Sequence, residues 1–194
     1  LETGGVIHHT GQPLAWAFAA DGRRLAVATA DLTVRILDAD TGRTVREFSR
    51  LGRHVLRVAL SPRGDRVAFA TDDLVVHVYG VDSGETISRP LKIRWDIGGL
   101  RFSPDGQYLF IHSLVGTLIK DLSSPQGSVR RIPGEATLTP NGVFSFFADY
   151  AKGGIKGYLF GGWDLETGLE VGSRISFSFR NVKPDLVHLS PAGR

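Results

Sequence analysis

Short runs of apolar residues alternate with turn residues along nearly the whole chain. The runs at 25–29, 67–71 and 108–112 each follow a glycine turn and are rich in residues that favour strands. Similar runs, also bounded by Gly, Pro, Asp or Ser, lie at 32–37, 55–61, 74–79 and 97–103. Such runs predict β-strands joined by tight turns. Because no stretch keeps a 3.6-residue apolar period with helix caps, we expect almost no helix.

Two kinds of turn recur along the chain and keep step with each other. Turns of the Ser-Pro-x-Gly type end at Gly22, Gly64, Gly106, Gly142 and Gly193. Turns of the Asp-x-x-Thr/Ser-Gly type end at Gly4, Gly42, Gly84 and Gly168, with a looser example at Gly127, and successive spacings in this series are 38, 42, 43 and 41 residues. Two independent signals with a period of about 42 residues indicate an internal structural repeat.

Four short strands in about 42 residues form the unit of a β-propeller blade. We therefore predict an all-β propeller of four-stranded antiparallel blades, about four to five of them present. The period favours a piece of a larger, seven-bladed ring, and a four-bladed or open array is the alternative. The predicted segments are an outer strand at 5–9, blades at 14–48, 54–89, 96–132 and 134–174, and a partial blade at 184–194.

The stretch TADLTVRILDADTG at 29–42 resembles the strand–turn–strand part of WD repeats, and Trp163-Asp164 matches the Trp-Asp pair of that family. The resemblance covers essentially the whole chain. It implies a hydrogen-bond network that would use His9, Thr29 and Asp31 in the first repeat, and Thr71 and Asp73 in the second. Leu37 and Tyr79 stand where the family has Trp, so the pattern favours a divergent member or a neighbouring propeller family.

Turn chemistry assigns structural roles to a further set of residues. Asp31 and Asp73 lie where one strand turns into the next, and we expect their carboxylates to accept hydrogen bonds from nearby backbone N–H groups. Gly22, Gly64 and Gly106 supply the conformational freedom of the tight turns. In the fourth repeat, the Gly-rich segment 148–162 is expected to be a lengthened connection, either a solvated insertion or a functional loop.

Composition and motifs exclude several classes of function. No apolar stretch approaches the roughly 18 residues of a membrane helix, so no membrane partner is expected. The net charge of +3 is too small and too dispersed to favour nucleic acid. The chain has no cysteine and no catalytic or phosphate-binding motif, and His8 and His9 are strand neighbours that point to opposite faces. We therefore expect no metal, no cofactor and no enzymatic activity, and a packing role for His77 and His112.

The WD-repeat resemblance implies a partner-binding surface, because in that family the loops leading into the inner strands gather on one face and commonly bind proteins. Here these loops hold mainly cationic and aromatic residues, which favour an acidic peptide or protein partner. The alternative is that they are ordinary polar loop residues, with Trp95 packed between blades. The predicted partner-binding residues are Arg53, His54, Arg94, Trp95, Asp96, Arg130, Arg131 and Lys183.

Three functions fit this sequence. The first is a non-enzymatic scaffold for protein–protein interaction. The second is a propeller enzyme, such as a hydrolase or lactonase with a metal in the central channel, which would need carboxylates and histidines converging on the axis. The third is a sensor or regulatory domain of a larger bacterial protein. The fold alone does not choose among them.

Overall fold

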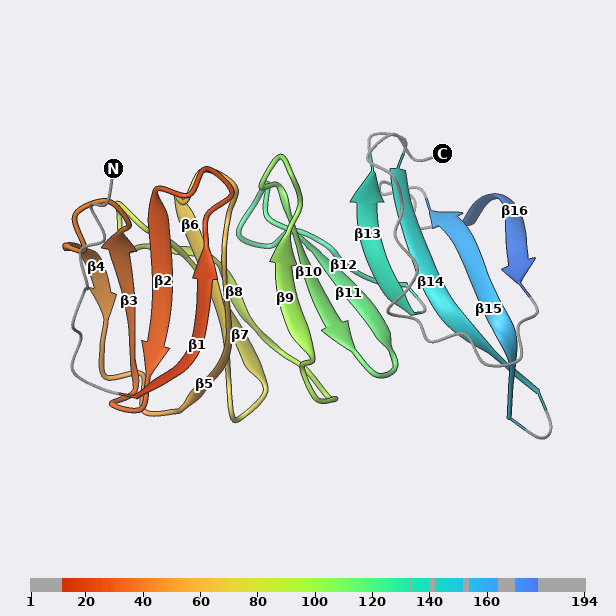
Figure 1. Cartoon of the computed structure of the whole chain (residues 1–194), viewed down its shortest axis with the longest axis horizontal. Coiled ribbons are helices and arrows are strands. Elements are labelled where there is room, and N and C mark those ends of the chain that lie inside the picture. The colour runs from red at the N-terminus through yellow and green to blue at the C-terminus, as the bar shows by residue number, and fades with distance from the viewer. Residues whose placement is uncertain (1–11, 133, 140–141, 152–153, 164–169, 178–194) are drawn as a thin grey trace, which may run out of the picture.

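The computed structural model describes residues 12–132, 134–139, 142–151, 154–163 and 170–177. Within these residues the chain forms sixteen strands and no helix, and every strand pairing is antiparallel (Figure 1). The strands build four separate four-stranded sheets, in which successive strands are neighbours. The described part of the chain therefore contains no helix that is long and apolar enough to cross a membrane.

Each sheet takes four consecutive strands of the chain. The first sheet contains β1 (Pro13–Phe18), β2 (Arg24–Thr29), β3 (Thr33–Asp38) and β4 (Thr44–Phe48). The second contains β5 (Val55–Leu60), β6 (Arg66–Thr71), β7 (Val75–Gly80) and β8 (Thr86–Lys92). The third contains β9 (Gly99–Phe102), β10 (Tyr108–Ser113), β11 (Gly116–Asp121) and β12 (Val129–Ile132). The fourth contains β13 (Glu135–Thr139), β14 (Gly142–Ala151), β15 (Gly154–Trp163) and β16 (Glu170–Phe177).

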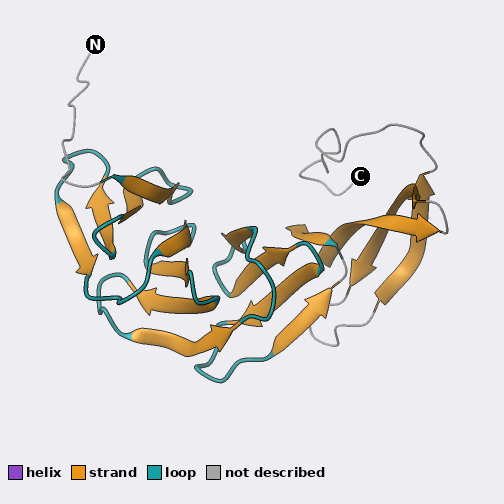
Figure 2. Cartoon of the chain, turned by 90° about the horizontal axis from the view of Figure 1, so that it is seen from below, coloured by secondary structure: helices purple, strands orange, loops and turns teal. Residues whose placement is uncertain are grey.

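The sheets follow one another along an open arc, each packed face to face against the next (Figure 2). Among the first three sheets, neighbouring sheets approach each other most closely at their first strands. β1 packs beside β5, and β5 packs beside β9. We call the end where these first strands begin the proximal end, which is the lower edge in Figure 1. It also holds the β2–β3, β6–β7 and β10–β11 turns. The opposite edge is the distal end.

Apolar side chains fill the spaces between neighbouring sheets. Val34 and Ile36 of the first sheet pack with Phe69 of the second, and all three are fully buried. On the other face of the second sheet, Val78 packs in a cluster with Leu109 of the third. Because side chains alternate along a strand, the second sheet has apolar residues on both faces. This double-sided burial makes each sheet depend on its neighbours.

The fold class predicted from the sequence is confirmed, with the four-stranded antiparallel sheets in sequence order. The predicted outer strand at 5–9 and the partial blade at 184–194 lie outside the described residues. The expectation of a lengthened Gly-rich connection at 148–162 is wrong. Those residues mostly extend β14 and β15, whose ladder continues to the pair Ala151 and Gly154 across a shift in register at Asp149/Tyr150.

Candidate functional site

Glycine turns close the distal end of each of the first three sheets. Gly22, Gly64 and Gly106 have φ values of 71°, 68° and 74°, a conformation that favours glycine. The N–H of Gly64 donates to the carbonyl oxygen of Ser61 at 2.8 Å, and that of Gly106 donates to Ser103 at 2.9 Å. The three glycines thus occupy equivalent structural turns.

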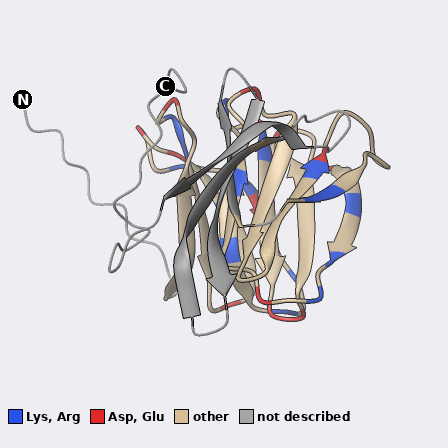
Figure 3. Ribbon diagram, turned by 90° about the vertical axis from the view of Figure 1, so that its right-hand side faces the viewer, with Lys and Arg blue, Asp and Glu red and all other residues tan. Residues whose placement is uncertain are grey.

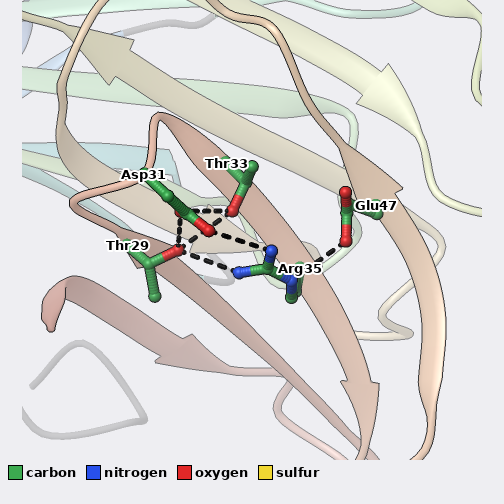
Figure 4. Close-up of polar contacts among 5 residues, drawn as sticks. All are labelled: Thr29, Asp31, Thr33, Arg35 and Glu47. Carbon is green, nitrogen blue, oxygen red and sulfur yellow. Dashed lines mark hydrogen bonds and ion pairs between the residues drawn. The ribbon is translucent and has the colours of Figure 1, made fainter. Parts of the chain in front are cut away.

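At the proximal end of the first sheet, the β2–β3 turn holds a closed polar network around Asp31 (Figure 4). The hydroxyls of Thr29 and Thr33 donate to one carboxylate oxygen of Asp31, from Thr33 at 2.7 Å. The guanidinium of Arg35 donates to the other oxygen at 3.0 Å, and also to Thr29 at 3.1 Å. Arg35 further pairs with Glu47 at 3.0 Å. The network ties together three strands of one sheet.

These contacts change the acidity of the groups involved. The Thr29 hydroxyl, followed by Thr33 and Arg35, holds the pKa of the Asp31 carboxyl well below its usual range. The same Asp31 hydrogen bond raises the pKa of Arg35. Both groups are therefore charged and satisfied, which indicates a structural role for the network.

The second sheet keeps part of this arrangement at its β6–β7 turn. The Thr71 hydroxyl donates to Asp73 at 2.6 Å, and this bond, with the charges of Lys92 and Arg53, lowers the pKa of Asp73. Lys92 also donates to the backbone carbonyl of Asp73.

In both turns the aspartate accepts from a threonine hydroxyl, which agrees with the pairing of Thr29 with Asp31 and of Thr71 with Asp73 that the WD-repeat resemblance implies. The expected backbone N–H donors have a smaller part, since the threonine hydroxyl is the largest cause of the lowered pKa of both carboxyls. A threonine at the end of the preceding strand is closer to the carboxylate. His9 lies outside the described residues.

The third sheet departs from this pattern. By the 42-residue offset, Val115 stands where the first two sheets have Asp31 and Asp73. Its neighbour Leu114 is 97% exposed and Val115 itself is 40% exposed. The β10–β11 turn therefore presents an apolar tip to solvent at the proximal end. Leu114 is not among the residues predicted from the sequence, although the 42-residue offset indicates that Val115 replaces the aspartate.

A groove of about 700 Å³ opens beside this tip, between the second and third sheets. Its walls come from the start of β5, the β6–β7 turn, the loop before β9, the start of β9 and the end of β10. The apolar lining residues are Leu56, Leu74, Ile97, Leu100 and Leu114, and the polar side chains among the lining residues include Arg57, Asp96, Arg101 and His112. Such a mixed lining suits a peptide segment.

Several of the predicted partner-binding residues lie around this groove. Arg53 and His54 are exposed just before β5, and Arg94 is exposed in the loop before β9. Asp96 lines the groove itself. Arg53 approaches Asp73 at 4.0 Å, a long and exposed ion pair that contributes little to stability. These residues thus lie in the proximal loops, as the sequence predicts.

Arg130 and Arg131 are placed differently from the prediction, because both belong to β12 and not to a loop. The guanidinium of Arg131 lies 4.9 Å from the ring centroid of Trp95 and donates to the carbonyl oxygen of Val115 at 2.8 Å. Trp95 is partly buried against the core between the second and third sheets. Arg131 thus joins β12 to the loop before β9 and to the β10–β11 turn. Lys183 lies outside the described residues.

The charge pattern of the strands is distinct from that of the turns. Figure 3 shows acidic residues mainly in the turns at both ends of the sheets, whereas basic residues also lie along the strands. At the proximal end, Asp72 and Asp96 accompany Arg53 and Arg94. The proximal end is therefore mixed in charge.

No described residues form a cluster of three or more His, Asp or Glu side chains that would hold a metal ion. His77 stacks on Phe69 with 5.3 Å between ring centroids, and burial lowers its pKa. His112 stacks on Phe110, and its Nδ1 lies 3.1 Å from the Thr117 hydroxyl. Both contacts agree with packing roles.

Comparison with solved structures defines the class as a β-propeller fold. The chain is similar to hydrazine synthase of Kuenenia stuttgartiensis, with a TM-score of 0.61, 15% identity, and coverage of 92% of this chain and 53% of that chain. It is also similar to the Cps50 (Swd1) β-propeller domain of Myceliophteria thermophila, with a TM-score of 0.63, 17% identity, and coverage of 96% and 61%. The chain thus spans somewhat more than half the length of both structures. No protein-family model and no curated protein matches the chain.

Proposed function

We propose that this propeller is a divergent, WD-repeat-like interaction module without enzymatic activity, and that its proximal end binds an acidic peptide or protein segment. The observation that carries the proposal is the groove of about 700 Å³ between the second and third sheets, which Arg57 and Arg101 line. Arg53 and Arg94 are exposed in the loops that lead into β5 and β9, next in the chain to residues near the groove. Leu114, at 97% exposure, lies at one wall of this groove. An apolar side chain of a partner would bury Leu114 together with the other apolar residues that line the groove.

Two arginines are suited to contact carboxylates of such a partner. Arg94 is exposed and forms no ion pair with any described residue. Among the described residues, Arg53 forms an ion pair only with Asp73, at 4.0 Å, and its side chain is 61% exposed. A bidentate contact with a carboxylate would fix the orientation of the partner, and the positive charges would raise its association rate. Arg131 is already engaged by Trp95 and Val115, so it is less suited to this contact.

The test uses two fluorescein-labelled ten-residue peptides, one alternating Glu and Leu and the other alternating Lys and Leu. We expect fluorescence anisotropy to show binding of the acidic peptide and little binding of the basic one. The double substitution Arg53→Glu and Arg94→Glu should weaken acidic peptide binding about tenfold or more, the equivalent of about 1.4 kcal/mol.

The matched control is Arg23→Glu with Arg43→Glu, which changes the same charge at two exposed arginines of the distal end. It should leave affinity nearly unchanged, apart from a general charge effect that added salt removes. Equal losses in both double variants, or equal binding of the two peptides, would reject the proximal end as the binding surface.

A further inference from the structure

Two glycines break the 42-residue repeat beside the start of β9. Gly98 stands where the first two sheets have Leu14 and Leu56, and Gly99 stands where the second sheet has Arg57. Both glycines line the groove between the second and third sheets, as do Leu56 and Arg57. At the place where the second sheet carries two large side chains, the third sheet therefore leaves space that belongs to the groove.

The backbone does not require glycine at either position. Neither residue has a φ in the left-handed region, in contrast to Gly64 and Gly106 of the distal turns. A Cβ added at Gly98 would meet the carbonyl oxygen of His112 at 3.6 Å, and one added at Gly99 would meet Cδ2 of the His112 ring at 3.8 Å. Both distances are ordinary van der Waals contacts. Neither turn geometry nor close packing against the described residues therefore accounts for the two glycines.

The third sheet places the large side chain of this ladder position on the other strand. In the second sheet Arg57 pairs with Ala70, whereas in the third sheet Gly99 pairs with His112. The imidazole ring of His112 stacks on Phe110, with 6.4 Å between ring centroids. The ring thus lines the groove from β10, and β9 leaves its own side open.

A positive charge replaces a small side chain two residues further along β9. Arg101 stands where the first two sheets have Ala17 and Ala59, and it is exposed and lines the groove. It forms no ion pair with any described residue. Residues two apart on a strand project from the same face at a spacing of about 7 Å, so Arg101 projects beside Gly99. The groove therefore combines an open apolar space with a nearby guanidinium that has no acidic partner in the described chain.

We propose that Gly98, Gly99 and Arg101 select the acidic partner, an inference that rests on the function proposed above. An aliphatic side chain of the partner fills the space at the two glycines and packs against Leu56 and Leu100. A carboxylate of the same segment binds Arg101. Because side chains of an extended segment alternate in direction, residues two apart face the same side. The selected segment therefore has an aliphatic residue two positions from Glu or Asp.

The test compares two fluorescein-labelled eight-residue peptides of identical composition and charge. One contains two copies of Ser-Leu-Ser-Glu, which place every Leu and Glu on the same side of an extended chain. The other contains two copies of Ser-Ser-Leu-Glu, which place Leu and Glu on opposite sides. Fluorescence anisotropy should show roughly fivefold tighter binding of the first peptide, because only that peptide can reach the glycine space and Arg101 together. Equal affinity for the two peptides would overturn the inference.

A filled variant tests the space at the glycines. Gly98→Leu with Gly99→Arg restores the residues that the second sheet has at these positions. Although it adds a positive charge, it should weaken binding of the Ser-Leu-Ser-Glu peptide about tenfold, because the space is occupied. Thr86→Arg adds the same charge at an exposed position of the distal end and should leave the affinity unchanged. Unchanged or tighter binding by a filled variant whose circular dichroism matches the parent would overturn the inference.

The role of Arg101 is tested without any change at the glycines, so it decides the inference even if the filled variant does not fold. Arg101→Gln should remove the preference for the Ser-Leu-Ser-Glu peptide, whereas Arg63→Gln, at an exposed position of the distal end, should keep it. A preference that survives Arg101→Gln would overturn the inference. If Arg53→Glu with Arg94→Glu weakens binding of both peptides and the parent still shows no preference, the proximal end remains the binding surface and only this inference fails. Absence of binding of either peptide to the parent would overturn the proposed function as well.

Discussion

The guanidinium of Arg66 donates a 3.0 Å hydrogen bond to the carbonyl oxygen of Gly106 and so joins the second sheet to the third. Arg24 makes the equivalent bond to Gly64 one repeat earlier. At the third equivalent position the chain has Tyr108, so the arginine joint belongs to the first two sheets only. Neighbouring sheets of a propeller meet mainly through apolar side chains, and this contact adds a directional bond that fixes their relative position.

Substitution of Arg66 by Met should weaken the joint while keeping most of its aliphatic packing. Loss of the hydrogen bond to Gly106 is expected to lower the free energy of unfolding by about 1–2 kcal/mol, because a partly buried carbonyl loses a charged donor. Urea unfolding followed by circular dichroism measures the change. Arg63→Met, at an exposed position of the same turn, serves as the control and should have almost no effect. Similar losses in the two variants would contradict a joint role for Arg66.

Asp31 should make stability depend on acid pH. Its pKa is lowered in the folded protein, mainly by the Thr29 hydroxyl, below the ordinary aspartate value of 3.8. The stabilisation is therefore fully present above about pH 4 and is lost as the pH falls below 3.8, when the unfolded state binds a proton more readily. Asp31→Asn should lower stability at pH 7 by about 0.5–1 kcal/mol, a value discounted for the exposure of the carboxylate.

The pH profile distinguishes this role from a simple loss of surface charge. Thermal unfolding between pH 3 and 7 should show a shallower acid decline in Asp31→Asn than in the parent. Asp72→Asn, an exposed aspartate in the corresponding turn of the second sheet, should retain the parent slope. The same slope in all three proteins would mean that the Asp31 network does not stabilise the fold.

His77 predicts a second pH dependence, at a higher pH. Burial lowers its pKa in the folded protein, despite an opposing effect of Asp73, so the unfolded chain binds a proton first as the pH falls below about 6.5. Stability should thus decrease from pH 7.5 to pH 5 through this group. His77→Phe keeps an aromatic ring against Phe69 and should reduce the decrease. His54→Gln, at an exposed position, is the control, and a decrease that persists in His77→Phe would assign it to another group.

Two leucines with positive φ offer a matched pair of turn substitutions. Leu32 and Leu74 have φ values of 62° and 63°, which are unfavourable for leucine and better tolerated by asparagine. Leu74 packs against the core between the second and third sheets and also lines the groove, whereas Leu32 is not part of either core cluster. Leu32→Asn should therefore be neutral or stabilising by up to about 1 kcal/mol. Leu74→Asn should lower the unfolding midpoint, and the opposite order would show that turn strain does not decide stability here.

The strands could be predicted from the sequence because turn residues lie at both ends of each apolar run. These residues favour a chain reversal, so each strand ends there for local reasons. β6 begins one residue before the predicted run at 67–71 and ends where the run does. The positions of Arg130 and Arg131 could not be predicted in this way, since the length of β12 depends on pairing with β11. The contact between Arg131 and Trp95 likewise joins residues far apart in the sequence. The 42-residue repeat indicates the apolar tip at Leu114, because it places Val115 where the first two repeats have aspartate. The charge of the loops does not indicate it.

Leu114 provides a test that separates binding from folding. Its side chain is 97% exposed, so Leu114→Ser should leave the unfolding temperature unchanged. If the proximal groove binds the Glu-Leu peptide, the same substitution should weaken binding roughly fivefold, because the leucine no longer buries apolar area against the peptide. Val129→Ser, at a 41% exposed position of β12, is a control that keeps the groove intact. Weaker binding in both variants would indicate a nonspecific apolar effect, whereas a loss confined to Leu114→Ser locates the peptide at the β10–β11 tip.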